Sequence, residues 1–264
     1  MYRQNQLKKL LNNGGKALGC WTSMDNPITT EILALAGFDF LLIDQEHGYG
    51  DAKGLSMQLQ ALSATNCTSL LRVPSADEAY VKKALDAGTE CLMFPTVNTA
   101  QEARDIVEMC RYAPRGRRGM APGMIRATNY GMDAANYVQT AHENTFIICQ
   151  IETPEGVANI SEMGKVEGVD MLFIGPNDLS CSLDKFAQYE DPEFVDLIEK
   201  AENAIKETGK LLGTIPYGKF GWQTILDRGF NLTTAGTEVA LLREAAVNII
   251  KDHSANNRSE QAAE

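Results

Sequence analysis

The sequence predicts an α/β fold, a (β/α)8 barrel, from three observations. Eight short apolar runs alternate with longer helical patterns along the chain. The runs show no alternation of polar and apolar residues, which is typical of strands buried on both faces of a parallel sheet. The 264 residues suit one such domain, because single α/β barrels run to about 250 residues. An open doubly wound sheet is the alternative, but no G-x-G-x-x-G follows an early strand.

The predicted elements follow this alternation from end to end. The strands are expected at residues 17–24, 38–44, 68–74, 91–97, 145–152, 170–175, 211–216 and 231–236. Helices are expected at residues 28–36, 51–64, 76–87, 99–110, 154–163, 192–208, 218–228 and 237–252. Several end at a glycine, such as Gly37, Gly88 and Gly209, which is the common residue just past a helix end.

Two segments depart from the pattern. Residues 111–136 are rich in Gly, Pro and Arg and occupy a single βα loop, where long loops usually form lids or interfaces. Residues 254–264 are polar, and we expect them to form a disordered tail. The remaining alternation predicts one barrel domain over residues 1–264.

Composition excludes some classes of partner. The chain carries 24 Lys and Arg against 35 Asp and Glu, a net charge of −11. Nucleic acids and anionic membrane surfaces both attract basic proteins, so neither is an expected partner. No apolar run approaches the roughly 20 residues of a membrane helix. We therefore expect a soluble, cytoplasmic protein.

Reactive side chains follow four predicted strands, where a barrel of this type places its active site. They are Asp44, Glu46 and His47 after the second strand, Arg72 at the end of the third, Gln150 and Glu152 after the fifth, and Asn177 and Asp178 after the sixth.

The pair Glu152 and Asp178 indicates one of two roles. Two carboxylates at one rim repel each other, and a hard divalent cation such as Mg²⁺ or Mn²⁺ would remove that cost. Alternatively, each carboxylate caps the helix that follows it. Spacing alone leaves both interpretations open.

The other candidates are two basic residues and one distant carboxylate. His47 at the rim suits acid–base catalysis. Arg72 is costly to bury alone, so it pairs with a rim carboxylate or binds an anionic substrate oxygen. Asp86, near the end of a helix, orients His47 only if its loop folds over the mouth; otherwise it is a surface carboxylate.

The arginines of the long loop bind anions or another subunit, or are solvated; they are Arg111, Arg115, Arg117, Arg118 and Arg126.

Seven motifs in order carry a resemblance to a known family. They are D-x-E-H-G at 44–48, L-R-V-P at 71–74, D-A-G-T at 86–89, R-Y-x-P-x-G-x-R-G at 111–119, Q-I-E-T at 150–153, V-E-G-V-D at 166–170 and F-I-G-P-N-D-L-S at 173–180. Over roughly residues 14 to 250 the chain resembles the HpcH/HpaI family of class II, metal-dependent pyruvate aldolases.

The resemblance implies a barrel of the phosphoenolpyruvate/pyruvate type that cleaves a 4-hydroxy-2-oxo acid into pyruvate and an aldehyde. It implies a divalent metal (Mg²⁺, Mn²⁺ or Co²⁺) and a homo-hexamer, a trimer of dimers that exchange the last helix. The implied roles are metal ligation by Glu152 and Asp178, acid–base catalysis by His47 with Asp86 as its partner, enolate stabilisation by Arg72, contact of Asp44 with metal-bound water, and substrate binding by Arg72, Gln150, Asn177 and Asp178.

The chain departs from the family pattern mainly in its long loop. Ala121 and Pro122 stand where Gly-Ser is common, so a hydroxyl near the substrate is missing, and Asn177 stands where alanine is common. Both the missing hydroxyl and Asn129 before Tyr130 bear on substrate preference rather than on the metal site.

Related chemistries remain open at the same site. An enolate site of this kind can decarboxylate oxaloacetate, make carbon–carbon bonds as in macrophomate synthase, or cleave thioesters as in citrate lyase β-like proteins. A Schiff-base mechanism is disfavoured, because no lysine ends a predicted strand. The intact set of His47, Arg72, Glu152 and Asp178 argues against a non-catalytic barrel.

Overall fold

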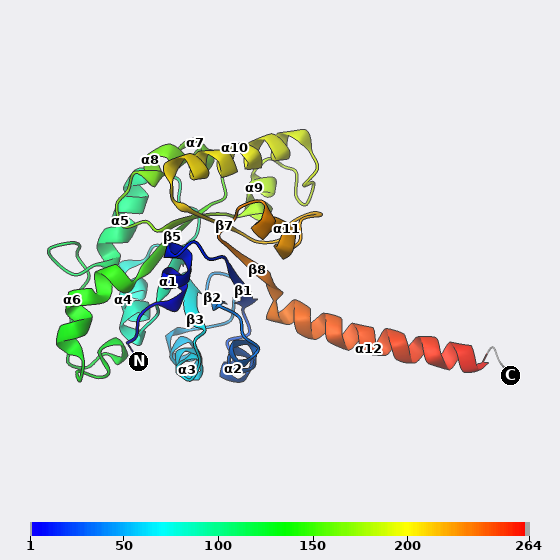
Figure 1. The fold of residues 1–264 in the computed structure, drawn as a ribbon, viewed down its shortest axis with the longest axis horizontal. Coiled ribbons are helices and arrows are strands. Elements are labelled where there is room, and N and C mark those ends of the chain that lie inside the picture. The colour runs from blue at the N-terminus through cyan, green and yellow to red at the C-terminus, as the bar shows by residue number, and fades with distance from the viewer. Residues whose placement is uncertain (1, 262–264) are drawn as a thin grey trace.

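Eight parallel strands close into a barrel in chain order, as the sequence predicts (Figure 1). The computed structural model describes the backbone of residues 2–261 and the side chains of residues 2–254. The strands are β1 (Ala17–Thr22), β2 (Phe40–Asp44), β3 (Thr68–Arg72), β4 (Cys91–Phe94), β5 (Phe146–Ile151), β6 (Met171–Ile174), β7 (Leu211–Thr214) and β8 (Leu232–Thr237).

Helices cover the outside of the barrel. The expected ones are α2 (Pro27–Leu35), α3 (Ala52–Leu62), α4 (Glu78–Ala87), α5 (Ala100–Cys110), α7 (Pro154–Ala158), α8 (Ile160–Gly164), α10 (Pro192–Thr208), α11 (Trp222–Asp227) and α12 (Glu238–Gln261). The single helix expected at 154–163 is two helices, because the backbone of Asn159 (φ −100°, ψ 5°) leaves the helical region. Sequence reasoning missed α1 (Gln6–Asn12), α6 (Ala134–Asn144), α9 (Pro176–Ser182) and the 3₁₀ turn η1 (Arg126–Thr128).

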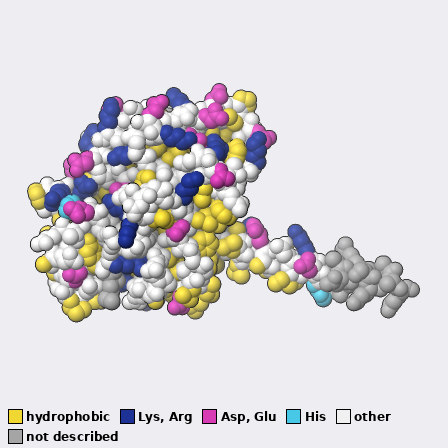
Figure 2. All heavy atoms as spheres, viewed as in Figure 1, with side chains coloured by type: hydrophobic (Ala, Val, Ile, Leu, Met, Phe, Trp, Pro, Cys, Tyr) yellow, Lys and Arg dark blue, Asp and Glu magenta, His cyan; other side chains and the backbone are white. Residues whose placement is uncertain are grey.

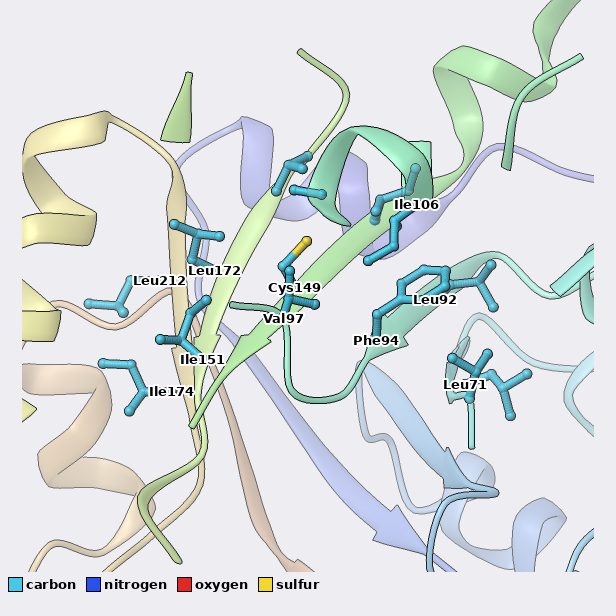
Figure 3. Packing of buried hydrophobic residues seen from close by; sticks show 14 of the residues in the cluster. Leu71, Leu92, Phe94, Val97, Ile106, Cys149, Ile151, Leu172, Ile174 and Leu212 are labelled. Atoms are coloured by element: carbon cyan, nitrogen blue, oxygen red, sulfur yellow. The ribbon is translucent and has the colours of Figure 1, made fainter. Parts of the chain in front are cut away.

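Two apolar layers explain why the strands lack polar alternation. Leu70 of β3 points into the barrel, where a cluster of side chains fills the interior. Leu7 and Leu11 of α1 join that cluster at the amino-terminal end of the barrel. The next residue, Leu71, belongs to a second layer between strands and helices, part of which Figure 3 shows. Burial on both faces is the dominant favourable term in forming such a barrel.

Helix α1 closes the amino-terminal end of the barrel. The backbone N–H of Leu7 donates to Thr68 Oγ1 at the start of β3 (3.2 Å), and Asn5 Nδ2 contacts Cys91 Sγ at the start of β4 (3.2 Å). The opposite, carboxyl end of the strands is therefore the open end.

Two of the five arginines of the long loop, Arg118 and Arg126, hold the loop to the barrel. Arg118 is buried, donates to Asp86 (2.7 Å) and to the Tyr137 hydroxyl (3.0 Å), and lies over the Tyr112 ring. Arg126 donates to the carbonyl of Ala87 (2.8 Å). For these two residues the solvated interpretation is wrong, because their donors are used inside the chain.

Helix α12 projects away from the barrel (Figure 1). Its backbone is helical to Gln261, residues 262–264 lie outside the described part, and the expected disordered tail over 254–264 stays a prediction. Within the described side chains α12 exposes Val239, Leu241, Leu242, Val247, Ile249 and Ile250, and α2 exposes Ile28, Ile32 and Leu35. Figure 2 shows apolar side chains gathered where α12 leaves the body.

None of the helices described in the structure is both long enough and apolar enough to cross a membrane.

Candidate active site

A cavity of about 490 Å³ opens at the carboxyl ends of the strands. The sequence-predicted residues His47, Arg72, Gln150, Asn177 and Asp178 line it, together with Trp21, Phe173 and the ends of β7 and β8. The barrel thus brings these side chains to one mouth, since all eight strands point the same way.

Asp44 and Arg72 form a buried, bidentate ion pair. They are neighbours in the register of β2 and β3, and Arg72 Nε and Nη2 donate to Asp44 Oδ1 (2.9 Å) and Oδ2 (2.7 Å). Trp21 Nε1 donates to the same carboxylate (3.1 Å), and the Arg72 guanidinium lies 4.6 Å from the Trp21 ring centre. Burial acts to raise the pKa of Asp44, but the hydrogen bonds and charge of Arg72 outweigh burial and hold this pKa below its usual range.

Glu46 and His47 lie next to this pair. Glu46 Oε2 is 2.7 Å from Arg72 Nη1, so the guanidinium contacts two carboxylates. Burial raises the pKa of Glu46 despite the lowering effect of Arg72. The imidazole of His47 is 69% exposed, with Nε2 3.9 Å from Glu46 Oε2. An exposed imidazole at the mouth of the cavity can reach a bound molecule.

Glu152 is buried and held on both sides. Its Oε1 accepts hydrogen bonds from the backbone N–H (2.7 Å) and hydroxyl (2.6 Å) of Thr96, while Gln150 Nε2 donates to Oε2. A side chain at Gly175 would place its Cβ 2.7 Å from Oε2, so that oxygen faces the turn that starts α9. Burial raises the pKa of Glu152, and the charge of nearby Asp178 adds to this effect, although Thr96 opposes it.

Helix α9 carries the last two predicted residues in its first turn. Asn177 and Asp178 are both exposed to the cavity mouth. The side-chain oxygen of Asn177 accepts a hydrogen bond from the Tyr189 hydroxyl (2.7 Å). Pro176 at the first helical position fixes where the helix begins, and so places Asp178 beside Glu152.

Asp86 lies at the other end of the barrel. A helix that follows a parallel strand runs back toward the amino ends of the strands, and Asp86 is in the last turn of α4. Its carboxylate pairs with Arg118 at 2.7 Å. The expected pairing of Asp86 with His47 is therefore not made within one chain, because the two residues lie at opposite ends of the strands.

The donor set suits a hard divalent cation. Glu152, Asp178 and Glu46 are close enough for their charges to act on one another, and Arg72, whose charge acts on Glu46, is already paired with Asp44. The side-chain oxygen of Gln150 is buried with no hydrogen-bond partner. Among the described residues there is no group of three or more His, Cys, Asp or Glu with metal-binding geometry. Mg²⁺ does not require one, since it is usually bound by one or two carboxylates plus water and substrate.

Sequence reasoning assigned no role to three residues that shape the site. Trp21 packs on Arg72 and hydrogen-bonds Asp44, Glu46 pairs with Arg72, and Thr96 holds Glu152. Glu46 stands inside the D-x-E-H-G motif, which was a usable signal. Trp21 and Thr96 carry no charge; Trp21 lies within β1 and Thr96 just after β4, so neither stood out as a reactive group.

Comparison with known proteins identifies the family. The model of the HpcH/HpaI aldolase/citrate lyase family matches residues 17–245. The chain is 36% identical over 245 residues to the hydroxypyruvate/pyruvate aldolase of Roseobacter denitrificans, covering 93% of this chain and 95% of that protein. It is 35% identical to the 4-hydroxy-2-oxo-heptane-1,7-dioate aldolase of Escherichia coli, covering 92% of each.

A solved structure agrees with these sequence matches. A HpcH/HpaI aldolase/citrate lyase family protein from Burkholderia cenocepacia superposes with a TM-score of 0.89 at 32% identity, covering 95% of this chain and 99% of that one.

Fold and site together define a carbon–carbon lyase built on a TIM barrel. The chain belongs to the HpcH/HpaI aldolase/citrate lyase family, and it is an enzyme of the aldolase type. The family is generally dependent on a divalent metal.

The Asp44–Arg72 pair generates a stability prediction. Replacing Asp44 with asparagine should lower the free energy of unfolding by about 3 kcal/mol, because Arg72 then stays buried with only Glu46 as its charge partner. Urea unfolding at pH 7 measures the loss. Asp105→Asn is the control, since its contact with Arg117 is long (3.8 Å) and exposed. An Asp44→Asn protein as stable as the wild type would contradict the role given to the pair.

The same variant checks the pH dependence of the pair. Because the pKa of Asp44 is lower in the folded protein than its ordinary value of 3.8, its stabilising effect is complete above that value and is lost as the pH falls through the folded pKa. Below roughly pH 4, wild-type stability should therefore fall more steeply than that of Asp44→Asn. Parallel slopes in urea unfolding at several pH values would show that the pair does not titrate this way.

Proposed function

We propose that this aldolase reversibly cleaves a 4-hydroxy-2-oxo acid into pyruvate and an aldehyde with the help of a divalent metal ion, Mg²⁺, Mn²⁺ or Co²⁺. One observation carries the proposal: two carboxylates, Glu152 and Asp178, lie together at a cavity that is also lined by Arg72, which is already paired within the chain. The names of the relatives, which include pyruvate and 4-hydroxy-2-oxo-heptane-1,7-dioate, support this class of substrate.

Glu152 and Asp178 are the proposed metal ligands, with Asp44 and Glu46 nearby. When bound, the metal would supply a Lewis acid for the keto oxygen and a template for the 2-oxo acid. Gln150 offers a buried, unpartnered oxygen, and Asn177 and Asp178 offer the exposed backbone of the first turn of α9. These groups would orient the 2-oxo acid end of the substrate.

Arg72 is the proposed stabiliser of negative charge on the enolate oxygen. Asp44 and Trp21 fix its guanidinium at the mouth, so the donors need no reorganisation as charge develops. No lysine lines the cavity within the described part of the chain, which agrees with chemistry that needs no Schiff base.

His47 is the proposed base that removes the proton from the C4 hydroxyl in the cleavage direction. It is exposed at the mouth and lies near Glu46, so it can move a proton between substrate and solvent. Since Asp86 of the same chain faces the other end of the barrel, any pairing of His47 with Asp86 requires a second copy of the chain.

The protein is proposed to assemble as a homo-hexamer, a trimer of dimers that exchange α12. The described apolar side chains of α12, among them Leu242, Ile249 and Ile250, are exposed in a single copy, and those of α2 are also exposed. Exposed apolar surface of this kind marks protein interaction sites, and a second copy offers the complementary pair of surfaces.

Metal removal tests the proposed chemistry. Exhaustive treatment with a chelator should abolish pyruvate release from a 4-hydroxy-2-oxo acid, because the keto oxygen loses its Lewis acid, and Mg²⁺, Mn²⁺ or Co²⁺ should restore it. A coupled pyruvate assay follows the reaction, and circular dichroism of the chelated protein controls for unfolding. Full activity without metal would overturn the proposal.

A conservative change at Arg72 tests its role. Arg72→Lys should lower kcat by a factor on the order of 10² to 10³, since a point charge does not reproduce the planar fork. Arg104→Lys, an exposed change, is the matched control, and thermal unfolding checks that the variant is folded. Wild-type turnover in folded Arg72→Lys would refute the assignment.

Charges placed on α12 test the assembly. Leu242→Glu combined with Ile250→Glu should lower the mass measured by analytical ultracentrifugation, because the apolar face could no longer be buried in a partner. Lys251→Glu changes an exposed residue of the same helix and serves as the control. A wild-type protein that sediments as a monomer would rule out the hexamer.

A further inference from the structure

Thr96 lies in the β4–α5 turn with an unusual backbone. Its φ is +50°, which is rare for a β-branched residue and costs free energy that the surroundings must offset. The two residues after Thr96 hold the turn in place. The Val97 N–H donates to the Gln150 carbonyl (3.0 Å), and Asn159 Nδ2 donates to the Asn98 carbonyl (2.8 Å). The strained conformation is therefore held by contacts with β5 and with Asn159, which lies between α7 and α8.

This conformation directs two donors of one residue to a single oxygen. The backbone N–H and the hydroxyl of Thr96 both donate to Glu152 Oε1, at 2.7 and 2.6 Å. Glu152 Oε2 then faces Gly175 and the turn that carries Asp178. Thr96 thus fixes which oxygen of the carboxylate faces the other proposed ligand.

We propose that Thr96 is a positioning residue of the metal site, which orients Glu152 and keeps it ready to bind the cation. The inference rests on the proposed function, because it takes Glu152 as a metal ligand. Thr96 is exposed at the rim and carries no charge, so it acts through Glu152 alone. Hydrogen bonds to a ligating carboxylate fix its orientation, and their loss typically weakens metal binding 10- to 100-fold.

Three substitutions of Thr96 separate what its side chain and its backbone contribute. Valine has the same shape and the same β-branch but lacks the hydroxyl donor. Serine keeps the donor and removes only the methyl group. Glycine removes the donor and relieves the left-handed strain. These three substitutions separate the hydroxyl from the shape and from the backbone strain.

Binding of Mn²⁺ to the full-length protein provides a readout that does not depend on turnover. Free Mn²⁺ is measured by electron paramagnetic resonance during a titration without substrate. Thr96→Val should raise the Kd about tenfold, since the backbone N–H remains and only one of two donors is lost. Thr96→Ser keeps the hydroxyl, so its Kd for Mn²⁺ should lie within about threefold of the wild-type Kd.

A second threonine provides the matched control. Thr89, before β4 at the amino end of the barrel, has a buried hydroxyl with no partner. Thr89→Val should leave the Mn²⁺ Kd unchanged. If Thr96→Val does not fold by circular dichroism, Thr96→Gly replaces it, with the same tenfold loss expected.

The outcomes separate the two proposals. A wild-type protein that binds no Mn²⁺ would refute the proposed metal-dependent function. A wild-type protein that binds Mn²⁺, together with a folded Thr96→Val or Thr96→Gly that binds it equally well, would refute the role of Thr96 alone. Loss in Thr96→Val with no rescue by serine would show that shape rather than the hydroxyl matters, which would also overturn the inference.

Discussion

The constraint on which this structure depends is the closure of eight parallel strands into one ring. Closure makes all carboxyl ends meet at a single mouth, so residues 100 or more positions apart in the sequence become neighbours. It also buries both faces of every strand, which is why Leu70 and Leu71 serve different layers of the core. The charged residues within the strands, Asp44 and Arg72, are the last residues of β2 and β3, and the candidate site lies at that rim.

The charged side chains at the rim differ in whether a partner of opposite charge lies beside them. Arg72 is hydrogen-bonded to Asp44 and forms an ion pair with Glu46, and these contacts hold the guanidinium without any ligand. Glu152, by contrast, is buried beside Asp178 with neutral donors only, and burial raises its pKa. A buried carboxylate supported by hydrogen bonds but by no cation of its own chain is a cost to folding. It is the kind of cost that proteins retain where function requires a charge to be available.

Two features of the chain point away from its own candidate site. Helix α12 turns its apolar side chains away from its own barrel, and Asp86 faces the end opposite to His47. In the proposed hexamer both features would lie near a second copy of the chain. The long loop between α5 and β5 is, however, tied to its own barrel through Arg118 and Arg126, so it forms a fixed surface rather than a free lid.

The sequence by itself determined the barrel and the mouth. Continuous apolar runs and glycine-ended helices locate all eight strands, because local burial and helix capping leave their mark on neighbouring residues. The motif residues Asp44, Arg72, Gln150 and Glu152 could be placed at the rim for the same reason. Only the tertiary structure decided which of these residues touch: the register of β2 and β3 joins Asp44 to Arg72, and the strained Thr96 reaches Glu152 across 56 positions. Such contacts depend on strand register and loop conformation, which no local pattern encodes, and the direction of α4 likewise separates Asp86 from His47.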